Sequence, residues 1–120
     1  MPARFVILAH SGHGPLHYDL MLQQGDALAT WQFEADPTTV DSSGLPGRRI
    51  AGHRTAYLDY EGPVSGGRGE VRRTEAGTWE PTETAEDCWR FALTGRRIDG
   101  RYELRRDREQ ANTWTLRRLS

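Results

Sequence analysis

The chain of 120 residues contains no lysine, a single cysteine and no long hydrophobic run. Cys88 alone can form neither an internal disulfide nor a cysteine-based metal site, and such sparse cysteine use is typical of the reducing cytoplasm. No apolar segment approaches the roughly 20 residues of a membrane span, and the first residues show no signal-peptide pattern. We therefore expect a cytoplasmic protein that makes no membrane contact.

The chain also has almost no net charge. All 16 basic residues are arginines, and 17 acidic residues bring the formal net charge to −1. An overall charge this small argues against strong non-specific binding of nucleic acid. Half of the arginines fall between residues 96 and 120, however. This segment is either one basic face that follows a nucleic-acid backbone or an ordinary solvated surface.

Helical periodicity is absent as well, because hydrophobic residues recur with a period of two in short runs separated by turns. Strands are expected at residues 4–9, 16–23, 27–33, 48–52, 70–74, 78–80, 88–94, 101–106 and 113–119. Short antiparallel strands in a small chain must close or stack to hide their edges. We predict a mainly β fold, a single small antiparallel β-barrel with little helix, formed by residues 1–120 as one domain. Its core should contain the four tryptophans.

The pattern that carries chemistry is a pair of histidines beside an aspartate, His10-x6-His17-Tyr18-Asp19. Residues two apart in a strand share a face, so His17 and Asp19 would point the same way. The loop of residues 11–15 would bring His10, at the end of the preceding apolar run, to the same edge. Imidazole and carboxylate groups are common ligands of Mn²⁺, Zn²⁺ and Fe²⁺. The motif therefore predicts a metal or phosphate site, and a simple surface hydrogen bond between His17 and Asp19 is the alternative.

The other face of this second strand should fill the core. The side chains expected there are Leu16, Tyr18, Leu20 and Leu22. His13 lies between two glycines of the preceding loop, where we expect a solvated side chain rather than a further ligand.

Two blocks of the sequence are distinctive in combination. One is the apolar strand that ends in His10, followed by Leu16-His17-Tyr18-Asp19. The other is His53-x3-Tyr57-Leu58-Asp59-Tyr60-Glu61-Gly62, followed by a glycine-rich loop and Gly77-Thr78-Trp79-Glu80-Pro81. Over nearly the whole chain, these blocks resemble the 3′-phosphoesterase domain of bacterial DNA ligase D and its free-standing relatives, which implies the same β-barrel architecture.

The resemblance implies a phosphoesterase that depends on a divalent metal, Mn²⁺ first, with Zn²⁺ or Co²⁺ as alternatives. Such an enzyme removes a 3′-phosphate or a terminal ribonucleotide from DNA or DNA/RNA ends in DNA repair, and a separate ligase or polymerase is an optional partner. By resemblance, the metal ligands are His10, His17 and Asp19. His53 corresponds to the histidine that contacts the phosphate, and Tyr57 to the active-site tyrosine.

The chain departs from the family at two functional positions. Leu8 stands where the family has a glutamine, and Met21 where it has a phosphate-contacting arginine. We expect Arg68, in Gly66-Gly67-Arg68-Gly69, to replace that arginine, with Arg54 as second choice. The glycine-rich loop is then either a flap that closes over a phosphate or an ordinary surface connection.

Other functions stay open at this point. A catalytically impaired module that binds nucleic-acid ends or a protein is favoured by Leu8 and Met21. A 2-His-1-carboxylate iron oxygenase is less favoured, since its triad would use His53 and leave His10 without a role. Asp59 and Glu61 suggest either a second metal or, more simply, groups that hold a loop in place.

Overall fold

A computed structural model describes residues 2–120, which form nine β-strands and two short 3₁₀-helices and no α-helix. The strands are β1 (Ala3–Ser11), β2 (His17–Gln24), β3 (Ala27–Phe33), β4 (Leu45–Arg54), β5 (Gly62–Pro63), β6 (Glu70–Thr84), β7 (Cys88–Gly95), β8 (Asp99–Arg106) and β9 (Trp114–Arg118). The 3₁₀-helices are η1 (Pro37–Thr39) and η2 (Thr55–Leu58). The described part of the chain contains no helix with the length and hydrophobicity of a membrane span.

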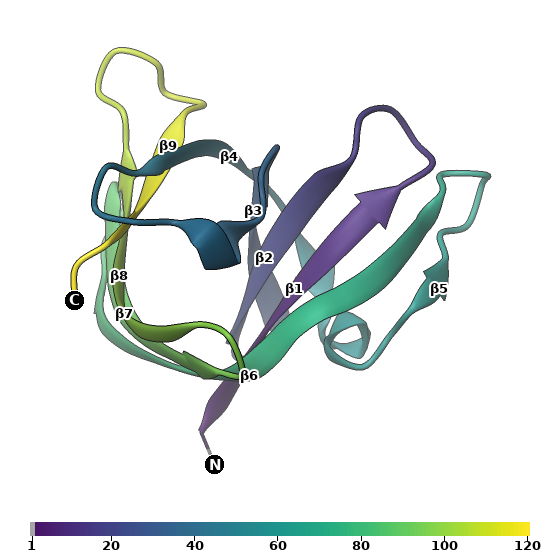
Figure 1. Ribbon diagram of the computed structural model, residues 1–120, viewed down its shortest axis with the longest axis horizontal. Coiled ribbons are helices and arrows are strands. Elements are labelled where there is room, and N and C mark those ends of the chain that lie inside the picture. The colour runs from purple at the N-terminus through teal and green to yellow at the C-terminus, as the bar shows by residue number, and fades with distance from the viewer. Residues whose placement is uncertain (1) are drawn as a thin grey trace.

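The strands form a closed antiparallel barrel. Their order is β1-β2-β3-β4-β9-β8-β7-β6-β5, and a second pairing of β6 with β1 closes a ring of eight strands. The short β5 pairs with β6 outside this ring, on the same side as η2 (Figure 1). Closure satisfies the backbone groups of edge strands. The predicted mainly β fold, a small antiparallel barrel with little helix, is confirmed.

One long strand replaces two predicted ones. Residues 70–74 and 78–80 belong to the continuous β6, which pairs with β1 along its first part and with β7 along its second. Gly77 permits this continuity, because a Cβ atom there would lie only 1.9 Å from the carbonyl oxygen of Thr94. The missing side chain thus allows two strands to approach closely.

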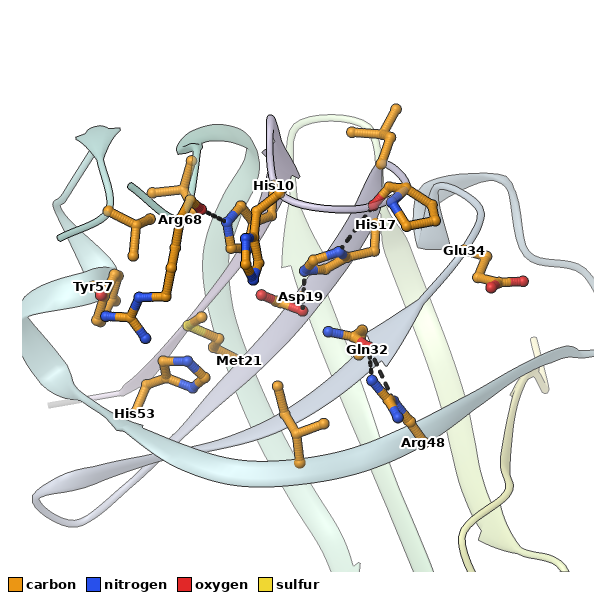
Figure 2. A pocket seen from close by; sticks show the side chains of 16 residues that line it. His10, His17, Asp19, Met21, Gln32, Glu34, Arg48, His53, Tyr57 and Arg68 are labelled. Carbon is orange, nitrogen blue, oxygen red and sulfur yellow. Dashed lines mark hydrogen bonds and ion pairs between the residues drawn. The ribbon is translucent and has the colours of Figure 1, made fainter. Parts of the chain in front are cut away.

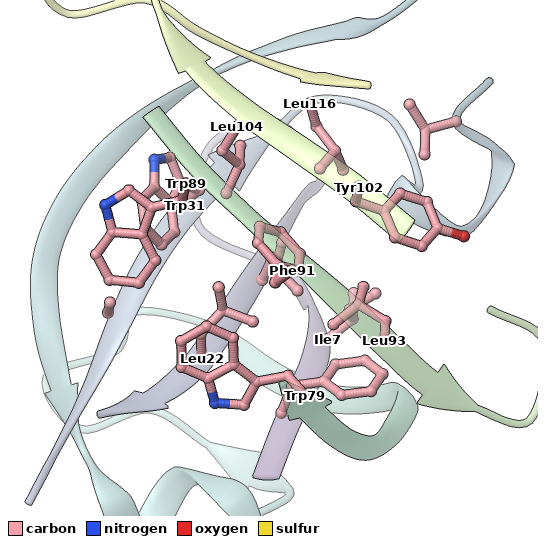
Figure 3. Close-up of a cluster of buried hydrophobic side chains, with 14 of the residues drawn as sticks. Ile7, Leu22, Trp31, Trp79, Trp89, Phe91, Leu93, Tyr102, Leu104 and Leu116 are labelled. Carbon is pink, nitrogen blue, oxygen red and sulfur yellow. The ribbon is translucent and has the colours of Figure 1, made fainter. Parts of the chain in front are cut away.

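The barrel interior is filled by aromatic and aliphatic side chains (Figure 3). All four tryptophans are buried there, as predicted. The Trp31 ring meets those of Trp89 and Trp114 edge-on, with centroids 5.0 and 5.6 Å away. The Arg49 guanidinium lies over Trp31 and Trp89, 4.9 and 5.2 Å from their ring centroids. This cation–π contact closes one side of the core.

A second, smaller core lies on the outer face of β1, β2 and β3. Its members are Val6, Leu8, Met21, Leu28, Leu58 and Val71. Leu58 comes from η2, which folds back over the barrel wall. The strand β2 is therefore buried on both faces, with Leu20 and Leu22 inside the barrel and Met21 outside it. This outer core supports the site described below.

The prediction of four core-facing side chains on the second strand is correct for Leu20 and Leu22 and wrong for Leu16. The strand begins at His17, so Leu16 belongs to the preceding loop, and it is 49% exposed. Tyr18 is half-buried and packs against the barrel core.

A buried carboxylate holds the turn between β7 and β8. Glu75 on β6 accepts hydrogen bonds from the backbone N–H groups of Ala76, Arg96, Arg97 and Ile98, at 2.6–3.0 Å. Burial alone would raise the pKa of the Glu75 carboxyl, and these four donors outweigh it, so that the pKa lies below its ordinary value. A Cβ atom on Gly95 would lie 2.8 Å from the carboxyl carbon, so glycine is needed beneath the group.

Substitution of Glu75 should destabilise the barrel in a pH-dependent way. At neutral pH, Glu75→Gln should lower the free energy of unfolding by about 2–3 kcal/mol, because the amide cannot accept from all four donors. A depressed pKa stabilises the fold above the ordinary glutamate pKa of about 4.3, and this contribution is lost as the pH falls through the folded-state value. Urea unfolding at a series of pH values from 7 downward should show that the stability difference between parent and variant narrows as the pH falls. Glu80→Gln, on the exposed part of the same strand, is the control, and equal effects of both substitutions would contradict the assignment.

Candidate metal centre

The hairpin of β1 and β2 brings three ligand-type side chains together. His10 pairs directly with His17 across the two strands, and Asp19 follows two residues later on the same face. One ligand atom from each lies within 4.8 Å of the other two. Asp19 is buried and both histidines are half-buried. Figure 2 shows His10, His17 and His53 arranged around Asp19. The structure thus places His10, His17 and Asp19 as the spacing led us to expect.

Backbone carbonyl groups fix the tautomers of both histidines. His10 Nε2 lies 2.6 Å from the carbonyl oxygen of Arg68, and His17 Nδ1 lies 3.3 Å from that of Pro15. A carbonyl oxygen can only accept a hydrogen bond, so each of these nitrogens donates its hydrogen. In the neutral rings, Nδ1 of His10 and Nε2 of His17 are then left with free lone pairs. Holding a ligand imidazole through its other nitrogen is the usual arrangement at metal sites.

With the His17 ring neutral, its contact with Asp19 contains no hydrogen-bond donor. His17 Nε2 faces Asp19 Oδ1 at 3.8 Å, and this oxygen is buried without a hydrogen-bond partner among residues 2–120. A buried acceptor left without a partner costs about 1–3 kcal/mol. Two acceptors that face each other are stabilised by a cation between them, either a proton or a metal ion. The donor set of two imidazoles and one carboxylate fits a divalent ion such as Mn²⁺ or Zn²⁺.

The raised pKa of Asp19 means that its surroundings disfavour the ionised carboxylate. Burial raises the pKa of its carboxyl, and the neighbouring His17, His53 and His10 only partly oppose this. The nearby Gln32 side chain also lowers the pKa, yet the net shift remains upward. An ionised Asp19 is therefore destabilised by its surroundings until a cation binds.

Gln32 and Arg48 extend the site across two more strands, and the sequence motif did not reveal them. Asp19 pairs with Gln32 on β3, which in turn pairs with Arg48 on β4. Arg48 donates to Gln32 Oε1 from Nε at 3.0 Å and from Nη2 at 2.7 Å. This bidentate contact leaves the Gln32 amide nitrogen free to turn toward Asp19. The short Gly25-Asp26 turn sets the β2–β3 register, and it is the signal from which Gln32 was predictable.

His53 lies outside the three-residue group and is held by a buried hydroxyl. The Thr30 hydroxyl donates to the Leu28 carbonyl oxygen at 2.9 Å and lies 3.1 Å from His53 Nδ1. Because the Thr30 hydroxyl donates its hydrogen to Leu28, its oxygen accepts a hydrogen bond from His53 Nδ1–H. In the neutral ring, His53 Nε2 then keeps its lone pair. Burial lowers the pKa of His53 more than the charge of Asp19 raises it. His53 is thus neutral at pH 7. The Tyr57 ring packs edge-on against the His53 ring, with ring centroids 5.3 Å apart.

These side chains surround a cavity of about 550 Å³. Arg68 lines it, and its guanidinium bonds within the glycine-rich loop to the Ser65 carbonyl and hydroxyl oxygens, at 2.8 and 3.3 Å. The side chain runs along the cavity wall toward Tyr57 (Figure 2). Arg54, the second choice, lines a neighbouring cavity instead. The structure therefore brings Arg68, rather than Arg54, to the metal cluster.

The structure also shows the surroundings of His13, Asp59 and Glu61, three residues whose roles the sequence left undecided. His13 is exposed at the cavity mouth and lies outside the three-residue group, as expected for a loop residue. Asp59 forms an ion pair with Arg4 at 2.7 Å, and Glu61 accepts from the backbone N–H of Arg73 at 2.9 Å. Both carboxylates hold loops in place, which favours that interpretation over a second metal.

Comparison with known families adds to this geometry. A family model described as the DNA Ligase D 3′-phosphoesterase domain matches residues 9–106. The match begins within β1 and ends with β8, and it includes every residue of the cavity. A comparison with curated protein sequences gives no significant match. Since the family model covers most of the 120 residues, the chain belongs to the DNA ligase D 3′-phosphoesterase domain family.

Proposed function

We propose that this protein is a metal-dependent phosphoesterase that processes the 3′ ends of DNA or DNA/RNA strands in cytoplasmic DNA repair. The observation that carries the proposal is the buried, unpartnered Asp19 Oδ1, which lies 3.8 Å from His17 Nε2 and beside His10. Membership of the 3′-phosphoesterase family supplies the reaction class. A separate ligase or polymerase that uses the processed end is the partner that this role calls for.

In this proposal His10, His17 and Asp19 hold the divalent ion, with Mn²⁺ first and Zn²⁺ or Co²⁺ as alternatives. Once bound, such an ion neutralises phosphate oxygens and lowers the pKa of a coordinated water. The carbonyl groups of Arg68 and Pro15 keep the two imidazoles in the tautomers and orientations that metal binding requires.

His53, Tyr57 and Arg68 would act on the phosphate itself. The negative charge of a bound phosphate opposes the burial that lowers the pKa of His53. The imidazole then takes up a proton as substrate binds, and Nε2–H can donate to the phosphate or to the leaving oxygen. Arg68 can add a guanidinium contact to the non-bridging oxygens, and the Tyr57 hydroxyl a hydrogen bond.

One alternative keeps support from the structure. Leu8 and Met21 are buried in the outer apolar core beneath the site, so two polar groups of the family are replaced by packing residues. A module of this fold that binds ends without turnover would fit that change. The iron oxygenase is disfavoured, because His10 rather than His53 joins His17 and Asp19 in the three-residue group.

The activity is testable on a 5′-labelled duplex that ends in a 3′-phosphate or in one ribonucleotide. Mn²⁺ should permit loss of the terminal group and EDTA should prevent it, on a denaturing gel. His17→Ala and His53→Ala should each slow the reaction at least about 100-fold, since each removes a metal ligand or an acid–base group. His13→Ala, a histidine outside the cluster, is the matched control and should keep most of the activity. Absence of turnover at high enzyme with Mn²⁺, Zn²⁺, Co²⁺ and Mg²⁺ would favour the binding module.

Metal binding and stability should respond in opposite directions to Asp19→Asn. Without metal at pH 7, the variant should be more stable than the parent, because the buried carboxylate is no longer ionised. The raised pKa of Asp19 makes the parent gain stability as the pH falls through that value toward the ordinary value of about 3.9, so the stability difference between variant and parent should shrink as the pH is lowered from 7.

Mn²⁺ at 100 times its dissociation constant should raise the free energy of unfolding of the parent by about 2.7 kcal/mol. The same Mn²⁺ concentration should stabilise Asp19→Asn far less. His53→Ala should retain it, because His53 lies outside the ligand group. Thermal denaturation with and without Mn²⁺ measures all three effects. A parent that gains nothing from any divalent ion would contradict the assignment of the ligands.

A further inference from the structure

A second cavity adjoins the metal cavity and has no role in the phosphoester chemistry described above. Its volume is about 250 Å³, and two of its wall residues, Tyr57 and Val64, also line the first cavity. The other walls are Arg54, Ala56, Tyr60, Pro63 and Ser65. All of these residues lie between the end of β4 and the glycine-rich loop, in the segment that folds over the outer face of the barrel. A ligand held at the metal cluster would reach this second cavity by passing Tyr57.

Two tyrosine rings give the second cavity flat aromatic walls. The rings of Tyr57 and Tyr60 are perpendicular, with centroids 5.7 Å apart and an interplanar angle of 84°. Tyr60 is 38% exposed, and within residues 2–120 it is one of three large hydrophobic side chains that are exposed. Its hydroxyl donates to the Pro63 carbonyl oxygen, which fixes the ring in place. The exposed ring is therefore a preformed stacking surface rather than a mobile side chain.

A positively charged side chain, Arg54, lies beside this aromatic surface. Arg54 lines the cavity, and within the described residues its guanidinium has neither a hydrogen-bond acceptor nor an ionic partner. Ser65 adds a hydroxyl at the same wall. Aromatic faces for bases combined with a free cation for the backbone are the features by which proteins hold single-stranded nucleic acid.

We propose that the second cavity binds the terminal nucleobase of the strand whose 3′-phosphate occupies the metal cavity. This inference rests on the proposed function, which places the phosphate at His10, His17 and Asp19. The ligand is a nucleobase joined to a 3′-phosphate, and the base stacks on Tyr60 beyond Tyr57. A base in this cavity has left the duplex stack, at a cost that is smallest for mismatched or single-stranded ends.

Kinetics with and without the terminal base test the proposal. Substrates are 3′-phosphorylated oligonucleotides that end in a normal nucleotide or in a tetrahydrofuran abasic analogue, and a free nucleoside 3′-phosphate shows whether the strand is needed beyond the terminal unit. Loss of one base stack costs about 1–3 kcal/mol, so Tyr60→Ala should lower kcat/KM for the normal end about 5- to 150-fold, mainly through KM. The abasic end should be hydrolysed equally by both proteins. Tyr60→Phe, which keeps the ring, should resemble the parent, and Tyr60→Leu, which keeps only apolar bulk, should resemble Tyr60→Ala.

The outcomes separate this inference from the function on which it rests. Suppose that the parent hydrolyses the normal end. If Tyr60→Ala has the same kcat/KM as the parent on that end, or loses as much kcat/KM on the abasic end as on the normal end, the base site is wrong and the phosphoesterase assignment stands. If the parent hydrolyses nothing, the proposed function fails, and binding of an oligonucleotide with 2-aminopurine at its 3′ end still tests the base site. Stacking should quench this fluorescence on the parent and on Tyr60→Phe, whereas equal quenching on Tyr60→Ala would overturn the proposal.

Discussion

The site depends on one arrangement, in which the Nε2 lone pair of a neutral His17 faces a buried carboxylate oxygen of Asp19. His17 Nε2 and Asp19 Oδ1 are both acceptors once the Pro15 carbonyl has taken the hydrogen on Nδ1. Arg68 fixes His10 in the same way, and Thr30 fixes His53. Three independent contacts thus direct free imidazole lone pairs while one carboxylate lacks a donor. The proposed binding of a cation at Asp19 would account for all of these contacts.

The fold supplies a rigid support for this arrangement at some cost in stability. The strand β2 is buried on both sides, by the tryptophan-rich core inside the barrel and by the outer core around Met21. Ligands on such a strand are held by packing rather than by a loop, which favours a fixed geometry. The same burial raises the pKa of Asp19 and destabilises its charged form. Function is therefore expected to oppose stability at this position.

The sequence was sufficient to predict the barrel, the tryptophan core and the approach of His10 to His17 and Asp19, because period-two alternation and hairpin connectivity are local properties. Other features could not be predicted from local sequence, because they depend on strand register or on contacts between segments that are distant in the chain. Gln32 joins Asp19 only through the β2–β3 pairing. Leu16 looked like a strand residue and is an exposed loop residue. The outer core exists because η2 folds back onto β1–β3, so that Met21, on the same face as His17 and Asp19, is buried.

The proposed function requires that His10, His17 and Asp19 bind one divalent ion. The most direct measurement is an anomalous difference map from crystals soaked in Mn²⁺, with data collected on both sides of the manganese absorption edge. We expect a single strong peak enclosed by these three side chains, with His53 facing it from across the cavity. A map without a peak there, or with the ion held by other residues, would contradict this assignment of the ligands.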